Sequence, residues 1–127
     1  MTLSRRILLA GLAIPAIPEY LAAQQKTGMY GLIGSMKATS GKRDELAAIL
    51  LAGTGDMPGC LSYVVAADPA EPDTLWITEV WDSAASHQAS LSLPAVRSAI
   101  AKGRPLIAVM GEYHATEPIG GYGIRRG

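Results

Sequence analysis

The sequence has little cysteine and histidine and no excess of charge of either sign. One cysteine, Cys60, excludes an intrachain disulfide. Two histidines and one cysteine, widely separated, do not have the spacing of metal ligands. Eleven basic residues balance eleven acidic ones, which argues against nucleic acid as the main partner. The glycines lack the spacing of a dinucleotide-binding loop, so no flavin or nicotinamide cofactor is expected. Because the histidines and the cysteine do not form a ligand cluster, no metal is expected either.

Residues 1–25 have the pattern of an export signal. Arg5-Arg6, followed by the apolar run 7–17, resembles the twin-arginine signature. The run is too short to span a bilayer, and Ala22-Ala23 offers small residues for cleavage. We therefore expect a periplasmic or otherwise exported protein with no stable membrane association after cleavage. The alternative is an N-terminal arm on a cytoplasmic protein.

The remaining chain predicts one α+β domain over residues 29–117, followed by a flexible, glycine-rich tail over 118–127. Ser40 is a candidate N-cap for the first helix, and Asp82 or Ser83 for the second. The expected elements are strands 29–38, 60–67, 75–81 and 106–114, helix 41–52, and two short helices between 82 and 103. This order is the ferredoxin-like split β-α-β pattern, a four-stranded antiparallel sheet with helices on one face.

Strand composition indicates how the two faces of this sheet are used. Both faces of the second and third strands carry large residues, and the face that the helices leave uncovered would expose apolar side chains; these residues are Tyr63, Val64, Val65, Trp76 and Val80. That pattern favours a homodimer with sheet packed on sheet, a dimeric α/β-barrel type of assembly. Gly31 and Gly34 thin the first strand, which leaves room for close backbone approach or for a ligand.

A carboxylate, an indole and an imidazole are expected close together beside the core. Period-two alternation puts Glu79 on one face with Trp81 and other apolar residues. A helix starting near Ser83 turns His87 inward with Leu91. The alternative is structural, with His87 a hydrogen-bonded core residue, Trp76 and Trp81 core filler, and Glu79 an ion-pair partner at a dimer interface.

Three stretches carry a resemblance to a known family: Met57-Pro58-Gly59-Cys60, Glu79-Val80-Trp81 and His87 through Pro94. The chain resembles the antibiotic biosynthesis monooxygenase domain family, in the branch usually called quinol monooxygenases. The resemblance implies a dimeric ferredoxin-like domain. Characterised relatives oxidise phenols, hydroquinones or polyketide anthrones with molecular oxygen, without metal or flavin. Haem-degrading relatives carry an asparagine on the first strand, and this chain contains no asparagine, so haem oxygenation is not expected.

The resemblance implies a cofactor-independent monooxygenase acting on a small phenol or hydroquinone and O₂. His87 is the expected base, or the donor that stabilises the substrate anion, and Glu79 either orients His87 or pairs with it. The predicted substrate-binding residues are Trp81, Tyr63 and Trp76, while Cys60 and His114 are interpreted as structural. The alternative is a non-catalytic dimeric module that binds a small apolar or aromatic ligand. A cavity that holds the imidazole beside Trp81 would favour the enzyme.

Overall fold

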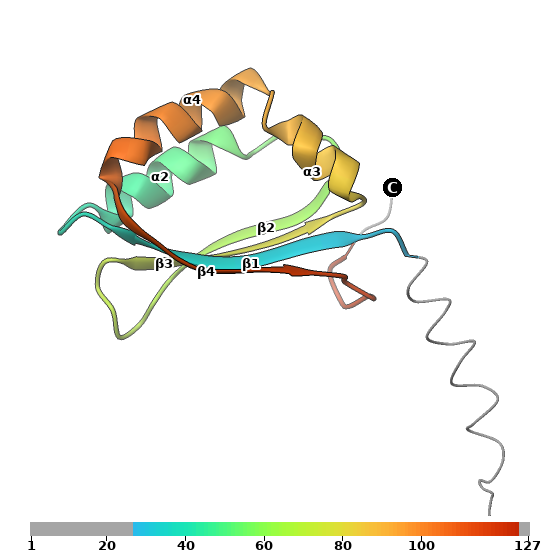
Figure 1. Ribbon diagram of the computed structural model, residues 1–127, viewed down its shortest axis with the longest axis horizontal. Coiled ribbons are helices and arrows are strands. Elements are labelled where there is room, and N and C mark those ends of the chain that lie inside the picture. The colour runs from blue at the N-terminus through green and yellow to red at the C-terminus, as the bar shows by residue number, and fades with distance from the viewer. Residues whose placement is uncertain (1–26, 125–127) are drawn as a thin grey trace, which may run out of the picture.

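The computed structural model describes residues 27–124, which form a four-stranded antiparallel sheet with helices on one face (Figure 1). The predicted ferredoxin-like α+β fold is confirmed. The predicted export signal lies outside the described residues. The elements are β1 (Tyr30–Ala38), α2 (Arg43–Gly53), β2 (Cys60–Ala67), β3 (Thr74–Trp81), α3 (Ala84–Ser90), α4 (Pro94–Gly103), the 3₁₀ turn η2 (Arg104–Leu106) and β4 (Ile107–Thr116).

The strand order across the sheet is β2-β3-β1-β4. The central strand β1 pairs antiparallel with β3 on one side and with β4 on the other. Because β3 lies between β1 and β2, the crossover through α2 skips one position, which is the split arrangement that the sequence predicts. In Figure 1, α2, α3 and α4 all lie over the same face of the sheet.

Helix α2 is held to the sheet by a buried leucine. Leu46 packs with Ala38, Leu75 and Ile77 in one apolar cluster. The predicted cap at Ser40 is wrong: the helix starts later, at Arg43, and its N-cap Lys42 makes no side-chain capping bond. Asp44 and Glu45 nevertheless lie in the first turn, where the helix dipole favours negative charge.

The two later helices start as their sequences predict. Ser83 is the N-cap of α3, and its hydroxyl accepts a hydrogen bond from the Ser86 amide at 3.0 Å. Helix α4 begins with Pro94, whose missing N–H costs nothing in a first turn. The last strand starts after η2 and runs two residues beyond the predicted His114, because pairing with β1 continues to Thr116.

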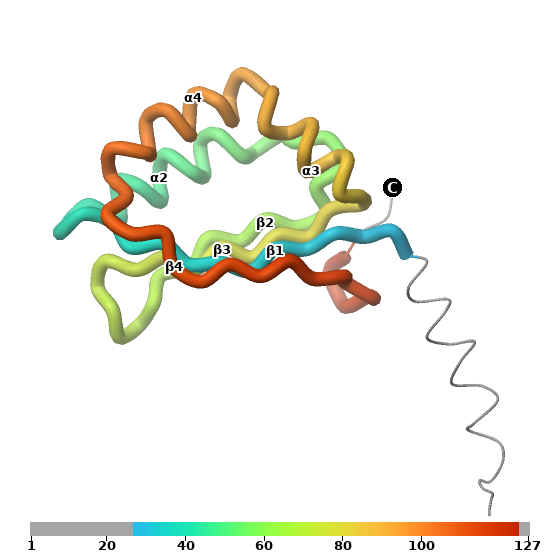
Figure 2. Tube along the Cα trace, viewed as in Figure 1, coloured from blue at the N-terminus to red at the C-terminus, as the bar shows by residue number. Residues whose placement is uncertain are grey.

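The covered and uncovered faces of the sheet differ sharply. On β3, Leu75, Ile77, Glu79 and Trp81 point toward the helices and are buried, as the alternation predicts. On the opposite face, which we call the open face, Ile33, Val64 and Val109 remain exposed. Figure 2 shows the loop between β2 and β3 curling to that side of the sheet.

The segment after β4 contains neither helix nor strand up to residue 124. Thr27 donates a hydrogen bond to the Pro118 carbonyl at 3.1 Å, which ties the two ends of the described chain together. The flexibility of the tail stays a prediction. No helix within residues 27–124 is long and apolar enough to cross a bilayer.

Candidate active site

A cavity of about 170 Å³ lies between the sheet and the helices. Residues from all four strands line the cavity, together with residues of α2, α3 and α4 and the residues that directly follow α2 and α3. An apolar cavity of ~150 Å³ is large enough to hold benzene. The volume is therefore that of one aromatic ring.

Glu79, Trp81 and His87 meet at this cavity. The Trp81 indole N–H donates to Glu79 Oε1 at 2.9 Å, and the His87 Nε2 lies 4.0 Å from the same oxygen. That separation is too long for a hydrogen bond, but it allows an ion pair when the imidazole is protonated. The His87 ring also stands edge-on to Trp81, with 5.4 Å between ring centroids, and lies 5.2 Å from the Tyr30 ring.

Burial changes the acidity of the groups around Glu79. Burial raises the pKa of the Glu79 carboxyl above its ordinary value, although the Trp81 hydrogen bond and His87 act in the opposite direction. Tyr63 lies directly opposite Glu79 on β2. Burial, followed by the Glu79 charge, raises the pKa values of Tyr63 and Tyr113. Both phenols therefore stay protonated at neutral pH and are available as hydrogen-bond donors.

Tyr113 joins the site although its sequence position gives no sign of it. Gly34 pairs with Tyr113 and Met36 with Met110, so β4 contains one extra residue relative to β1 over this stretch. This β-bulge turns both Met110 and Tyr113 toward the cavity, whereas regular alternation would put them on opposite faces. The Tyr113 ring lies over Gly34, where a Cβ would collide with it. The predicted room beside Gly34 is thus filled by the chain's own tyrosine.

The structure brings together four of the predicted site residues, His87, Glu79, Trp81 and Tyr63, all of which line the cavity. Trp76 is not with them. It lies on the open face because it stands five positions, an odd number, before Trp81 on the same strand. There its indole N–H donates to Asp68 Oδ2 at 2.9 Å.

The two residues interpreted as structural lie outside the cavity lining. Cys60 is half-buried at the start of β2, its thiol donating to the Ser62 carbonyl, and burial raises the pKa of that thiol. His114 is exposed and pairs with Ile33 on the open face. Within residues 27–124, no three His, Cys, Asp or Glu side chains are placed to hold a metal ion.

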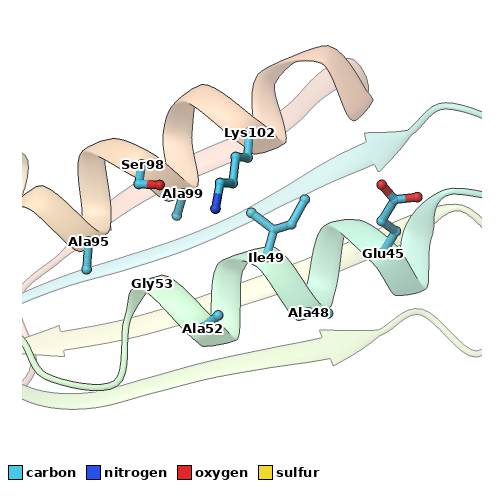
Figure 3. A pocket seen from close by; sticks show the side chains of 9 residues that line it. All are labelled: Glu45, Ala48, Ile49, Ala52, Gly53, Ala95, Ser98, Ala99 and Lys102. Atoms are coloured by element: carbon cyan, nitrogen blue, oxygen red, sulfur yellow. The ribbon is translucent and has the colours of Figure 1, made fainter.

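A larger hollow of about 400 Å³ runs over the outer surface between α2 and α4 (Figure 3). Small side chains form most of it, because the helices touch where Gly53 meets Ala99. Figure 3 shows Lys102 reaching from α4 toward α2, with Glu45 near one end. The hollow lies away from the Glu79 and His87 pair and follows from the packing of small residues.

Comparison with known proteins identifies the family. The profile described as antibiotic biosynthesis monooxygenase matches residues 29–102. A crystal structure from Chloroflexus aurantiacus J-10-fl assigned to this family is 67% identical, with a TM-score of 0.75; the match covers 76% of this chain and 99% of that one.

More distant structures share the fold. One from Caulobacter crescentus CB15, also assigned to the family, has 19% identity and a TM-score of 0.67, covering 74% of this chain and 92% of that one. One from Mycobacterium tuberculosis has 20% identity and a TM-score of 0.62, and the match covers 74% of this chain and 98% of that one. The curated proteins give no match. The family profile and the 67% identical structure together show that this chain belongs to the antibiotic biosynthesis monooxygenase family.

Proposed function

We propose that this protein is a cofactor-independent monooxygenase that oxidises a small phenol or hydroquinone with molecular oxygen. The observation that carries the proposal is the ring-sized cavity in which His87, Glu79 and Trp81 meet. Imidazole is a suitable base because its ordinary pKa lies near neutral pH. Apolar side chains make up most of the remaining lining, so a bound ring would be shielded from water.

In the proposed reaction, His87 accepts the proton of a ring hydroxyl. The resulting oxyanion is electron-rich and transfers an electron to O₂, which lets oxygen bond to a ring carbon. One oxygen atom stays on the ring. The other leaves as water with two hydrogens of the substrate, so a hydroquinone becomes a hydroxyquinone. The substrate supplies all the electrons that reduce O₂, and the protein binds, deprotonates and excludes water.

Glu79 has the position of an orienting group for His87. The Trp81 hydrogen bond holds Glu79 Oε1, the same oxygen that lies nearest to the His87 Nε2. Once His87 has taken the proton, the carboxylate stabilises the imidazolium. This division of roles needs no further titratable residue.

The proposed enzyme is a homodimer formed through the open face. Ile33, Val64 and Val109 are exposed there in the single chain. A specific interface buries at least ~1,000 Å² in total, and the open face offers all four strands of the sheet to a partner. Pairing two open faces would remove these side chains from water.

Oxygen consumption with a panel of hydroquinones tests the proposed chemistry. Acid–base catalysis by one side chain is typically worth ~10²- to 10⁴-fold, so His87→Ala should slow turnover by about that factor. His87→Gln should not restore it, because glutamine keeps a hydrogen bond but cannot accept the proton. His114→Ala is the control for loss of a histidine outside the cavity and should leave the rate unchanged; because His114 lies on the open face, the rates are compared at a concentration where the variant sediments like the wild type.

Thermal unfolding of the same variants separates the alternatives. Early melting of both His87 variants would mean that His87 is a core residue. Folded His87 variants that turn over at the wild-type rate would remove His87 as the base. A folded wild type that binds phenols without consuming oxygen would favour the non-catalytic binding module.

A further inference from the structure

Four large apolar side chains that line the cavity are also open to solvent. They are Leu91, Ile100, Met110 and Tyr113, with exposed fractions of 40%, 38%, 59% and 56%. We call them the rim. They come from the end of α3, from α4 and from the edge strand β4, so the cavity opens to solvent between these elements. The β-bulge in β4 is what places Met110 beside Tyr113 on this side.

Glu79 and Trp81 are buried more deeply than the rim. Glu79 is 9% exposed and Trp81 1%, while the rim is apolar except for the Tyr113 hydroxyl. Among residues 27–124, no lysine, arginine or aspartate lines the cavity. The hydroxyls of Thr54 and Ser90 donate to the carbonyls of Leu50 and His87 at 2.7 and 2.6 Å. A ligand therefore meets an apolar entrance first and polar groups last.

The volume limits what can pass inside. At about 170 Å³, the cavity accommodates one substituted ring. Any longer part of a ligand has to remain at the rim. An exposed apolar patch beside a cavity is typical of a surface that contacts an apolar ligand, and this rim carries no charge that would recognise a phosphate or carboxylate.

We propose that the substrate is a single-ring phenol or hydroquinone that carries an apolar side chain. Its hydroxyl faces Glu79 and His87, its ring fills the cavity, and its chain lies across Leu91, Ile100 and Met110. This inference rests on the proposed function, because it names the substrate class of the same site. It adds that, among ligands with a single ring, the length of the alkyl chain determines affinity.

Binding of 4-alkylresorcinols to the full chain tests this without turnover. Resorcinols are phenols and the proposed reaction needs O₂, so calorimetric titration under anaerobic conditions measures affinity alone. Burial of one methylene contributes ~0.8 kcal/mol, which corresponds to about fourfold in Kd at full burial. We expect Kd to fall about two- to fourfold per carbon from resorcinol through the ethyl and butyl derivatives.

Substitutions at the rim show where the alkyl chain of the ligand binds. Met110→Gln and Leu91→Gln should flatten the dependence of Kd on alkyl-chain length, so that the ratio of Kd between resorcinol and 4-butylresorcinol falls toward one. Leu51→Gln is the matched control, because Leu51 is 55% exposed on α2 and does not line the cavity. It should preserve the wild-type dependence.

The outcomes separate the inference from the proposed function. Resorcinol binding that does not depend on chain length, or a dependence that survives both rim variants, overturns the inference alone. Failure of the whole series to bind overturns it as well. Oxygen consumption with unsubstituted hydroquinone then decides independently whether the proposed function stands.

Discussion

Strand β3 carries two tryptophans that make the same bond on opposite faces of the sheet. The Trp81 indole donates to Glu79 at 2.9 Å on the helix-covered face, and the Trp76 indole donates to Asp68 at 2.9 Å on the open face. The donor, the acceptor type and the distance are the same. Any difference between the two carboxyl groups must therefore come from their surroundings.

The two carboxyl groups shift in opposite directions. Burial raises the pKa of Glu79 because the carboxylate loses its hydration and the Trp81 bond restores only part of that loss. The Trp76 bond and the amides of Glu71 and Ala70 lower the pKa of Asp68, which is only partly buried. The same indole bond therefore accompanies a lowered pKa at the partly buried Asp68 and a raised pKa at the buried Glu79.

The largest expected effect concerns the open face itself. Val64 is 50% exposed in the single chain, and in the proposed dimer it lies in the interface. Val64→Asp would bury an unpaired charge from each partner, which we expect to cost about 3 to 5 kcal/mol of dimer stability. Sedimentation over a range of concentrations measures the change in the dissociation constant.

Leu51→Asp is the control for this variant, since Leu51 has a similar exposed fraction but lies on α2. It should leave self-association unchanged. A well-folded wild-type monomer at micromolar concentration would refute the proposed dimer. Equal effects of both substitutions would show that the open face is not the interface.

The next effect separates the two tryptophans. Trp81→Phe removes the donor from a buried carboxyl and leaves space in the core, so we expect a loss of about 2 to 3 kcal/mol of unfolding free energy. Trp76→Phe breaks a bond in water and should cost less than about 1 kcal/mol. Denaturant unfolding measures both changes.

Ligand binding sharpens the same comparison. Trp81 lines the cavity and Trp76 does not, so Trp81→Phe should weaken resorcinol binding while Trp76→Phe leaves it unchanged. The assignment of Trp76 to the substrate site remains correct only if the Trp76 variant loses affinity. In that case the ligand lies on the open face.

Local patterns predicted the parts of the fold that depend on neighbours in sequence. Alternation along β3 put Glu79 beside Trp81, and the helix that starts after Ser83 turned His87 toward both. These placements follow from strand and helix periodicity, which a sequence displays directly. The wrong cap at Ser40 shows the limit, because the helix start depends on how α2 docks on the sheet.

Placements that depend on distant pairing could not be predicted. Tyr113 and Met110 reach the cavity through a bulge whose position is set by the partner strand β1. Gly34 was a visible sign of close approach, but nothing in the sequence named Tyr113 as the side chain that fills the space. Trp76 is a different case, because the strand alternation visible in the sequence already puts it on the opposite face from Trp81, and only its residue type groups it with the site.

The smallest expected effect is a pH dependence whose sign differs between the two carboxyl groups. Since the pKa of Glu79 is raised by folding, the native state binds more protons than the unfolded chain above the ordinary value of 4.5. Stability should fall as pH rises from there through the raised pKa, with a slope of at most ~1.4 kcal/mol per pH unit for one proton. For Asp68, whose pKa is lowered, stability should fall instead as pH drops below its ordinary 3.8.

Unfolding by denaturant at a series of pH values tests this sign difference. Glu79→Gln keeps an oxygen that can accept the Trp81 bond but cannot ionise, so it should remove the loss on the alkaline side of 4.5. Asp68→Asn should remove only the loss on the acid side of 3.8. Glu117→Gln, an exposed position, is the control and should change neither limb. If Glu79→Gln leaves the alkaline limb unchanged, burial does not dominate at Glu79. Glu79 on the covered face would then not have the raised pKa that distinguishes it from Asp68 on the open face.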